Sequence, residues 1–374
     1  MVLVPPTFSA VNDETVQPDW VELRRLRLPM VAPFRTAGGM LDHREVLLLR
    51  VSLDDQEGIA ECAALPEPTY TGEYVDGAFD VLRRYLVPSV WGETVPVVGH
   101  PMAASALQTA LLDARLRRDG RSLAQHLGAE RTAVPAGAAV GFAPDIGHLL
   151  AEVEALVAHG YRRIKVKIRP GWDVEPLAAV RELVGPKMLL QADANGAYRL
   201  ADSPQLQRLE RLDLTLIEQP LPADDLLGHA ELARRLTLPV CLDESIDSLP
   251  MAALALELGA CSVVCVKPGR VGGLETAAAI HDLCRDTGAD AWVGGMLETG
   301  IGRAALLALA ALPGFTLPGD LSATGRWYAD DLTHRLDLDP DGRLAVPTGA
   351  GVSPLPDLDV LDDHTIGTEL MRRP

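Results

Sequence analysis

The sequence has no apolar run long enough to cross a membrane and no cluster of Lys and Arg. The best candidate for a span, Met251 to Val266, is interrupted by Glu257 and falls short of the ~18 residues that a membrane span needs. The 34 Lys and Arg residues stand against 52 Asp and Glu, which gives a net charge of -18. A protein this acidic repels nucleic acids and anionic membrane surfaces. We therefore expect neither nucleic-acid nor membrane partners.

Signals for export and for disulfide bonding are also missing. Residues 1–17 contain two prolines and no Lys or Arg, unlike a signal peptide, which begins with a basic region. We expect these residues to form a disordered tail. The five cysteines form an odd set without a C-x-x-C spacing, which is typical of reduced core residues in a cytoplasmic protein. Cys265 is an alternative candidate for a catalytic thiol, because it shares a strand face with Lys267.

The sequence does contain five charged residues that each close a short apolar run. They are Lys167, Asp193, Glu218, Asp243 and Lys267, separated by 26, 25, 25 and 24 positions. One strand, one helix and two short loops of a (β/α)₈ barrel take up about 25 to 30 residues. The period therefore predicts that each of the five lies at the carboxyl end of a successive parallel strand, where the active sites of such barrels lie.

The chain is longer than a bare barrel. Its 374 residues exceed the ~250 of that fold, so we predict a TIM-like (β/α)₈ barrel with an α+β N-terminal capping domain. Alternating apolar and polar residues from Trp20 to Arg50 predict antiparallel strands with one exposed face. We expect the capping domain over residues 18–131, the barrel over 132–328 and a C-terminal segment over 329–374.

Three further strand positions follow from apolar segments. We expect the first barrel strand at Pro135 to Gly141, the seventh at Ala291 to Gly294 and the eighth at Phe315 to Leu317. Near the C-terminus, the segment Arg343 to Val346 predicts a strand that returns to the capping domain.

The three carboxylates Asp193, Glu218 and Asp243 would converge on one hard cation. A site with only oxygen ligands favours Mg²⁺ over Zn²⁺. Each residue taken alone is more simply a helix N-cap or a solvated loop charge, but three at matched strand ends favour a metal site. Three residues of the same loops are expected to support the ligands: Asn195, Gln219 and Glu244.

Two lysines on opposite walls of such a site suit the removal of a proton next to a carboxylate. The ion would stabilise the resulting enediolate. A lysine side chain has a pKa of about 10.4, so it needs nearby positive charge or burial to act as a base. Lys165 shares a strand face with Lys167, and Arg270 follows Lys267, so each is expected to lower the pKa of its neighbour. An ordinary charged strand end is the alternative, but it does not explain the second lysine across the barrel.

The glycine-rich segment from Gly294 to Gly302 is not a dinucleotide-binding loop. It lacks the spacing and the distal acidic residue of that fingerprint. We expect it to let a substrate approach the backbone at the seventh strand. The histidines fall in predicted loops and helices, so we expect no histidine base or metal ligand.

These residues resemble the enolase superfamily, and within it the muconate-lactonizing-enzyme subgroup. That pattern is a Lys-x-Lys strand, three acidic metal ligands and a sixth-strand lysine, and the chain shows it as Lys165-Val166-Lys167, Asp193, Glu218, Asp243 and Lys267. A finer similarity, from Val21 to about Pro356, is to the o-succinylbenzoate synthase and N-succinylamino acid racemase family, also called N-acylamino acid racemases. It rests on residues 32–36, 170–173, 217–221, 267–273 and 294–300.

The resemblance implies an enzyme that uses Mg²⁺, or Mn²⁺ as a substitute, to grip the carboxylate of a small substrate. In a racemisation Lys167 and Lys267 would act as opposed bases. In the dehydration that gives o-succinylbenzoate for menaquinone biosynthesis, Lys167 would act as base and then acid while Lys267 stays cationic. The resemblance also implies a homo-oligomer and capping-domain loops, near residues 34–39 and 69–74, that close over the site. Substrate-binding or supporting residues are expected at Asn195, Arg270, Gly295, Met296, Leu297, Phe34, Tyr70 and Glu244.

The chain departs from the family at two positions. Relatives often have Asn two residues before the sixth-strand lysine and Ser at the end of the first strand, where this chain has Cys265 and Ala139. Both changes remove hydrogen-bonding capacity near the substrate, so a dipeptide epimerase or another acid or sugar lyase of the superfamily stays an alternative. A Schiff-base aldolase using Lys267 and a non-enzymatic barrel are alternatives from other classes.

Overall fold

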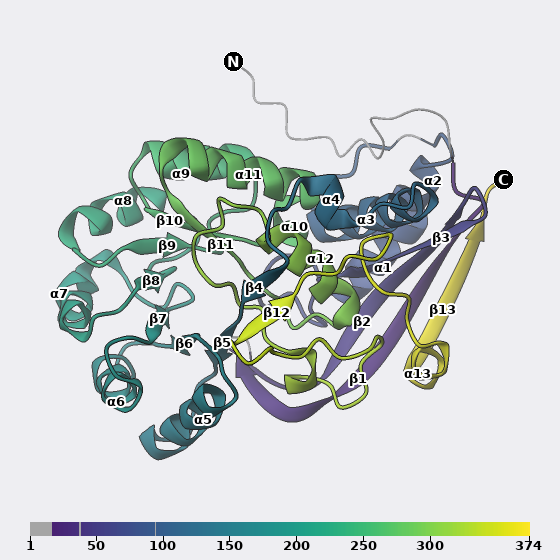
Figure 1. Ribbon diagram of the computed structural model, residues 1–374. Helices are drawn as coiled ribbons and strands as arrows, with labels where there is room; N and C mark the ends of the chain where they lie inside the picture. The colour runs from purple at the N-terminus through teal and green to yellow at the C-terminus, as the bar shows by residue number, and fades with distance from the viewer. Residues whose placement is uncertain (1–16, 37–38, 94) are drawn as a thin grey trace.

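The computed structural model describes residues 17–36, 39–93 and 95–374 of the protein (Figure 1). All but the last residue of the expected disordered tail, 1–17, lie outside this range. Two sheets organise the described chain, one of four strands and one of seven. In Figure 1 the seven-stranded sheet and its helices lie to the left, and the four-stranded sheet lies to the right. No helix within the described residues is long and apolar enough to cross a membrane.

The four-stranded sheet is the core of the capping domain. It is antiparallel in the order β13-β1-β2-β3, so the predicted antiparallel strands are confirmed. Its strands are β1 (Trp20–Thr36), β2 (Gly39–Leu53), β3 (Gln56–Cys62) and β13 (Thr365–Arg372). The associated helices are α1 (Val75–Val81), the π-helix η1 (Leu82–Leu86), α2 (Val87–Ser89), α3 (Pro101–Arg118) and α4 (Leu123–Leu127).

Each face of this sheet is covered by a different part of the molecule. Helix α3 covers one face, and it approaches β3 so closely that a Cβ atom on Gly58 would lie 2.1 Å from the carbonyl oxygen of Ala110. The other face, including Leu28 and Leu48, packs against Ile301 and Trp327 of the barrel side. The capping domain is therefore joined to the barrel through an apolar interface.

The seven-stranded sheet is parallel, and its strands lie in chain order. They are β5 (Gly137–Val140), β6 (Arg163–Lys167), β7 (Leu189–Asp193), β8 (Leu216–Glu218), β9 (Val240–Leu242), β10 (Val263–Val266) and β11 (Asp290–Val293). The intervening and following helices are α5 (Ile146–Ala158), α6 (Val174–Val184), η2 (Leu200–Asp202), α7 (Ser203–Gln207), η3 (Arg208–Leu212), α8 (Leu226–Arg235), α9 (Leu249–Glu257), α10 (Pro268–Val271), α11 (Leu274–Thr287) and α12 (Gly300–Ala310).

The predicted positions of the five periodic charges are confirmed. Lys167, Asp193 and Glu218 are the last residues of β6, β7 and β8, while Asp243 and Lys267 directly follow β9 and β10. Every β6 and β8 residue is buried, as expected for parallel strands covered on both faces. The five side chains therefore meet at one rim of the barrel.

The eighth strand predicted at Phe315 to Leu317 is not formed; the barrel sheet has seven strands within the described residues. An irregular segment closes the ring instead. The backbone N–H groups of Thr316 and Asp320 donate to the carbonyls of Ala291 (3.0 Å) and Val293 (3.1 Å), and Gly319 forms a bridge to Ala136. Pro318 interrupts this segment, and proline has no N–H group to donate to a regular ladder. The predicted place of the eighth segment in the chain was right, but the prediction that it forms a regular strand was wrong.

The prediction that residues 343–346 return to the capping domain is also wrong. Strand β12 (Arg343–Ala345) pairs with β4 (Ala133–Pro135), which leads into the first barrel strand. The physical reason is Leu344, whose side chain is buried in the barrel core. The 3₁₀-helix η4 (Thr324–Arg326) precedes this pair, and the chain reaches the capping sheet only with β13, after α13 (Leu358–Asp363). In Figure 1, β13 lies along the edge of the purple strands.

Candidate active site

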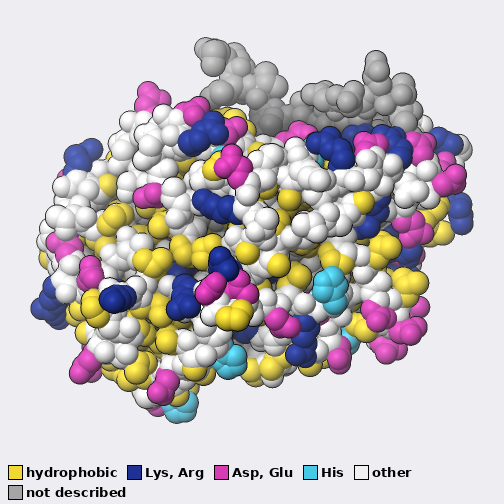
Figure 2. Space-filling model, in the orientation of Figure 1, with side chains coloured by type: hydrophobic (Ala, Val, Ile, Leu, Met, Phe, Trp, Pro, Cys, Tyr) yellow, Lys and Arg dark blue, Asp and Glu magenta, His cyan; other side chains and the backbone are white. Residues whose placement is uncertain are grey.

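A cavity of about 280 Å³ opens at the carboxyl ends of the barrel strands, between the two domains. The capping domain contributes Phe34, Leu41, Leu65, Thr69 and Tyr70 to its wall. The barrel contributes the charged rim and the backbone of the glycine-rich segment. Across the face of the molecule shown in Figure 2, Lys and Arg side chains are interspersed with Asp and Glu.

All but three of the predicted site residues line this cavity. Those that line it are Lys165, Lys167, Lys267, Asp193, Asp243, Asn195, Glu244, Gly295, Met296, Leu297, Phe34 and Tyr70. Glu218, Gln219 and Arg270 are buried outside the lining, and each bonds to a lining residue. The structure therefore brings the predicted residues together in one place.

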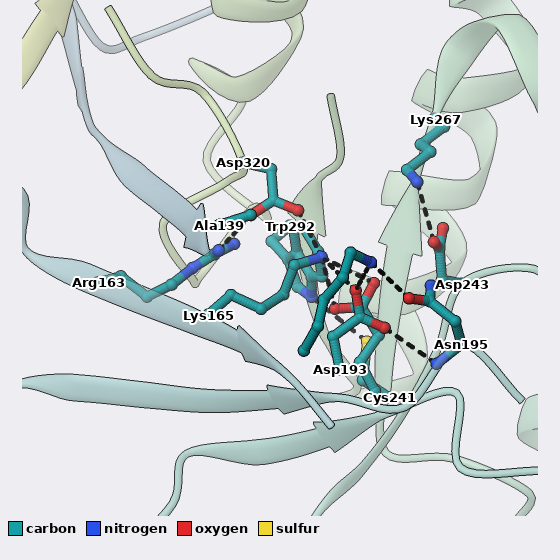
Figure 3. Close-up of polar contacts among 12 residues, drawn as sticks. Ala139, Arg163, Lys165, Asp193, Asn195, Cys241, Asp243, Lys267, Trp292 and Asp320 are labelled. Atoms are coloured by element: carbon teal, nitrogen blue, oxygen red, sulfur yellow. Dashed lines mark hydrogen bonds and ion pairs between the residues drawn. The ribbon is translucent and has the colours of Figure 1, made fainter. Parts of the chain in front are cut away.

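Lys165 is surrounded by carboxylates. Its Nζ atom donates to Glu218 Oε2 at 2.8 Å and Oε1 at 3.1 Å and lies 3.5 Å from Asp193 Oδ2. It also forms an ion pair with Asp320. Figure 3 shows Lys165 between Asp320 and Asp193. Although burial alone would lower it, the carboxylates of Asp320, Glu218 and Asp193 hold the pKa of Lys165 well above its usual value, so this lysine stays cationic.

Lys167 and Lys267 lie on opposite sides of the ring, because three strands, β7, β8 and β9, separate β6 from β10 on one side. Lys167 Nζ lies 3.0 Å from Asp193 Oδ2 and also donates to Asn195 Oδ1. Lys267 Nζ lies 2.9 Å from Asp243 Oδ2 and 2.9 Å from the hydroxyl oxygen of Tyr70. Each of the two lysines thus pairs with one of the three carboxylates, Lys167 with Asp193 and Lys267 with Asp243.

Arg270 does not bring the pKa of Lys267 below its usual value in this structure. Its guanidinium bonds to both Asp243 and Tyr70, and its positive charge acts to lower the pKa of Lys267. Burial acts in the same direction, but the carboxylate of Asp243 outweighs both and holds the pKa of Lys267 well above its usual value. Arg270 acts on the pKa of Lys267 in the expected direction, but the expected net decrease is wrong because Asp243 raises this pKa more strongly.

The loops after β7 and β8 adopt backbone conformations that L-residues seldom use. Asn195 has φ 42° and Gln219 has φ 40°, which is typical of residues held in place by a functional site. Gln219 Oε1 accepts from the N–H groups of Asp243 (3.0 Å) and Ser245 (3.2 Å). Asn195 Nδ2 donates to Glu244 Oε1 at 2.8 Å. These contacts fix the loops around the carboxylates, as expected for Asn195, Gln219 and Glu244.

The donor set fits a hard divalent cation. Asp193, Glu218 and Asp243 are at most 2% exposed, and carboxylates are costly to bury together without positive charge. Burial, followed by the nearby Asp193, raises the pKa of Glu218 well above its usual value. Oxygen atoms of Glu218 and Asp243 and the Cys265 sulfur all lie within 4.8 Å of one another. The nearby Lys and Arg side chains lower the pKa values of Asp193 and Asp243, and a cation at this position would relieve the repulsion that remains at Glu218.

Cys265 is not a reactive thiol. All five cysteines are free and buried, which confirms the expectation of core residues. Burial, with Asp243 second, raises the pKa of the Cys265 thiol well above its usual value, whereas nucleophilic cysteines have lowered pKa values. Its burial and raised pKa count against the thiol alternative. The other departure, Ala139, presents a methyl group to the cavity beside Lys165, its register partner.

Several residues of the site were not predicted. They are Asp320, Ser322, Arg303, Arg326 and Trp327. Asp320 follows the irregular segment that replaces the eighth strand, so strand patterns could not locate it. The sequence holds a further signal for the site as a whole, although not for these residues: it contains only four lysines, which are Lys165, Lys167, Lys187 and Lys267. Three of these four line the cavity.

Comparison with known proteins agrees with this geometry. The family model described as "Enolase C-terminal domain-like" matches residues 148–360. An N-succinylamino acid racemase from Amycolatopsis sp is 52% identical over 358 residues, which cover 92% of this chain and 96% of that protein. The chain belongs to the enolase superfamily. An o-succinylbenzoate synthase from Geobacillus stearothermophilus is 41% identical over 350 residues, covering 89% of this chain and 92% of that protein.

The enolase-superfamily fold is shared along nearly the whole chain. A solved structure of a superfamily member from Listeria innocua Clip11262 superposes with a TM-score of 0.91 at 34% identity, covering 96% of this chain and 100% of the other. The resemblance seen in the sequence and the predicted fold class, a TIM-like barrel with an α+β capping domain, are confirmed. Within the enolase superfamily the chain is an enzyme of the N-succinylamino acid racemase and o-succinylbenzoate synthase type. This finding excludes the non-enzymatic barrel and counts against the Schiff-base aldolase.

Proposed function

We propose that this enzyme removes the α-proton of an N-succinylamino acid, or a related N-acylamino acid, and returns a proton to the opposite face. The observation that carries the proposal is the placement of Lys167 and Lys267 on opposite sides of one cavity, with three buried carboxylates between their strands. Racemisation needs a proton donor and a proton acceptor on two faces of one carbon. The two lysines meet this requirement.

Asp193, Glu218 and Asp243 would hold a divalent cation, which we propose to be Mg²⁺. When bound, it would supply positive charge that stabilises the negative charge developing on the substrate carboxylate as the α-proton leaves. Lys165 is bonded to Glu218 and Asp320 and is therefore committed to holding the carboxylates rather than to moving protons.

The two proposed bases need opposite protonation states at the start of a turnover. A base must be neutral, whereas the lysine that returns the proton must be cationic. Lys267, whose ion pair with Asp243 keeps it protonated, is suited to the donor state. Lys167, which contacts Asp193 and the amide of Asn195 on the other side of the cavity, then takes the role of the base.

Part of the cavity wall is apolar and suits a large apolar side chain. The Phe34 and Trp327 rings meet edge to face with centroids 5.0 Å apart, and Met296 and Leu297 lie in the same cavity. Aromatic and aliphatic walls of this kind bind apolar groups. N-succinyl-L-phenylalanine is therefore the substrate of choice for a test.

The test follows the α-proton by NMR in D₂O with Mg²⁺ and N-succinyl-L-phenylalanine. We expect exchange and racemisation in the wild type, and loss of racemisation, read from the optical rotation, by at least about 10³-fold in Lys167→Ala and Lys267→Ala. Lys187→Ala is the matched control, since this remaining lysine is exposed and lies outside the cavity. Equal exchange in all three variants would refute the two-lysine mechanism.

The second candidate is the dehydration that forms o-succinylbenzoate, supported by the relatives named for that activity. The same site serves both reactions, because both start by removing a proton α to a carboxylate. Dehydration requires Lys267 only as a cation, which agrees with its raised pKa. Lys267→Arg separates the two: it should abolish racemisation but retain part of a dehydration activity. A homo-oligomer stays a prediction from the resemblance, and a cytoplasmic location stays a prediction from the cysteines.

A further inference from the structure

The turn between β11 and α12 contains one residue in a strained conformation. Leu297 has φ 62°, a left-handed conformation that a bulky side chain seldom adopts because its Cβ atom crowds the following carbonyl oxygen. Such strain persists only where surrounding contacts impose it, and it is concentrated at functional sites. Leu297 is only partly buried and lines the cavity. The strained backbone therefore lies at the wall that a substrate would contact.

The hydroxyl of Tyr328 holds the backbone of this residue. It donates to the carbonyl oxygen of Leu297 at 2.6 Å, and no other donor reaches that oxygen among the residues that the structure describes. Tyr328 is fully buried in the apolar cluster between the two domains. Burial raises the pKa of its hydroxyl well above the usual value, so the hydroxyl keeps its proton and stays a donor. Without this bond the carbonyl would lack a partner and the strained turn would lose a main support.

The helix that follows the turn is held by other groups. Both carboxylate oxygens of Asp331 accept from the N–H group of Gly300, the first residue of α12, at 2.9 and 3.1 Å. Glu61 of the capping sheet accepts from the N–H group of the N-cap residue of the same helix at 3.0 Å. Loss of the Tyr328 hydroxyl should therefore release the turn without releasing α12.

Leu297 belongs to an apolar corner of the cavity that three chain segments build. Phe34 comes from the capping sheet, and Trp327 directly precedes Tyr328. The Trp327 ring has a support of its own, because its Nε1 atom donates to Ser322 Oγ at 2.9 Å. The position of Leu297 depends instead on the backbone turn that Tyr328 holds.

We propose that Tyr328 is a positioning residue that acts through the backbone of Leu297 to hold this apolar corner against the side chain of the bound amino acid. The inference rests on the proposed function, in which that side chain lies against the apolar part of the wall. Tyr328 does not line the cavity, so it acts through Leu297 rather than by touching the substrate. It should therefore affect binding of the side chain and leave the proton transfers to the lysines.

The test compares N-succinyl-L-phenylalanine with N-succinyl-L-alanine, with binding to the Mg²⁺-loaded protein measured by calorimetry and kcat by racemisation. The wild type should bind the phenylalanine compound at least about 10-fold more tightly, because it buries a larger apolar side chain. Tyr328→Phe keeps the ring and removes only the hydroxyl. It should weaken the phenylalanine compound about 3- to 10-fold, the effect of one hydrogen bond. The affinity for the alanine compound and both kcat values should stay within about 2-fold of the wild type.

Tyr198→Phe is the matched control for a general loss of stability. Tyr198 is also buried, and its hydroxyl donates to Asp173 Oδ2 at 3.0 Å outside the cavity. This variant should lower the Tm at least as much as Tyr328→Phe but leave the affinities for both compounds unchanged. A selective effect of Tyr328→Phe would then reflect the position of Leu297 and not the stability of the fold.

Leu297→Gly tests whether Tyr328 acts through this residue. Glycine adopts the left-handed conformation without strain but lacks the side chain, so this variant should also lose the preference for the phenylalanine compound. Adding Tyr328→Phe to it should cause no further loss, because both changes act on the same contact.

Three results would overturn the proposal: additive losses in the double variant, equal weakening of both compounds by Tyr328→Phe, or a wild type that does not distinguish the compounds. The expected binding pattern without any α-proton exchange in the wild type would instead overturn the proposed reaction and leave the role of Tyr328 in place.

Discussion

Lys267 Nζ lies 2.9 Å from the hydroxyl oxygen of Tyr70 and 4.5 Å from the centroid of its ring. Lys267 follows a barrel strand, whereas Tyr70 belongs to the loop before α1 in the capping domain. The tyrosine also bonds to Arg270 and lies 3.3 Å from both carboxylate oxygens of Asp243. The capping domain therefore contributes a group to the immediate surroundings of a proposed proton donor, and the site is complete only when both domains are in contact.

Tyr70→Phe should impair turnover without disturbing the fold. The variant keeps the ring above the ammonium of Lys267 but removes the hydroxyl that accepts from it. Loss of one hydrogen bond to a charged group should lower kcat/KM about 10- to 100-fold, measured by exchange of the α-proton in D₂O. Tyr74→Phe, on an exposed tyrosine of the same loop, should change the rate less than 2-fold, roughly the effect of a surface substitution. Equal rates for the two variants would mean that the hydroxyl of Tyr70 has no role.

Mg²⁺ should stabilise the folded protein through the three buried carboxylates. At a concentration of 100 times its Kd, a ligand that binds only the folded state adds about 2.7 kcal/mol to the free energy of unfolding. We expect Mg²⁺ to raise the Tm of the wild type and chelation to reverse the rise. Glu218→Gln removes one ligand charge and should abolish most of the shift, whereas the exposed Glu57→Gln should leave it intact. A Tm independent of Mg²⁺ in the wild type would contradict the metal assignment.

Cys265 should make the ion site accept soft cations. Its sulfur and oxygen atoms of Glu218 and Asp243 lie within 4.8 Å of one another, and thiolate sulfur is a ligand that soft metals prefer. Adding Cd²⁺ to the metal-free protein should produce the ultraviolet charge-transfer absorption of a cadmium–thiolate bond. Cys265→Ser should lose this band, and Cys62→Ser, at a buried cysteine of the capping sheet, should keep it. A band that survives in Cys265→Ser would assign the bond to another thiol.

The rim of the barrel was predictable because each βα unit has a nearly constant length. The spacing from Lys167 to Lys267 therefore identified successive strand ends without any knowledge of contacts. The pairing of these residues was not predictable. Lys165 was expected to lower the pKa of Lys167, but in the folded protein it bonds to Glu218 and Asp320. Which side chains pair depends on distances across the barrel, and the spacing of residues in the sequence does not give these distances.

Apart from Arg303, which lies in the regular helix α12, the residues that were missed lie where the chain leaves its regular pattern. Asp320 follows an irregular segment with Pro318, and Arg326 ends a three-residue 3₁₀-helix. Neither segment has the length or periodicity from which an element can be recognised. The same holds for Arg343 to Ala345, a strand so short that its one buried side chain, Leu344, fits the barrel core as well as a sheet. Irregular segments are positioned by tertiary contacts, so their contribution to the site becomes visible only in the structure.

The junction of the two domains contains a carboxyl group that should make stability depend on pH. Glu61, at the end of β3, accepts from the hydroxyl (2.7 Å) and N–H (3.0 Å) of Thr299 and from the N–H of Gly302 (3.2 Å). Burial, reinforced by the nearby Glu298, raises the pKa of Glu61 from 4.5 to about 8. Because this value is higher in the folded than in the unfolded state, folding binds a proton between these pH values, and the stability that it contributes is lost as the pH rises through this window.

Glu61→Gln should therefore flatten the pH dependence of unfolding. Between pH 5 and pH 8 the ionisation of Glu61 should cost the wild type on the order of 3 kcal/mol, measured by urea unfolding, and the variant should avoid this loss because an amide does not titrate. Glu73, whose pKa burial raises to about 7, acts in the same direction, so some dependence should persist in the variant. Glu57→Gln, at an exposed position on the same strand, should follow the wild-type curve. A Glu61→Gln curve as steep as that of the wild type would show that Glu61 ionises at an ordinary pH in the folded protein, and that the contacts with Thr299 and Gly302 offset its burial.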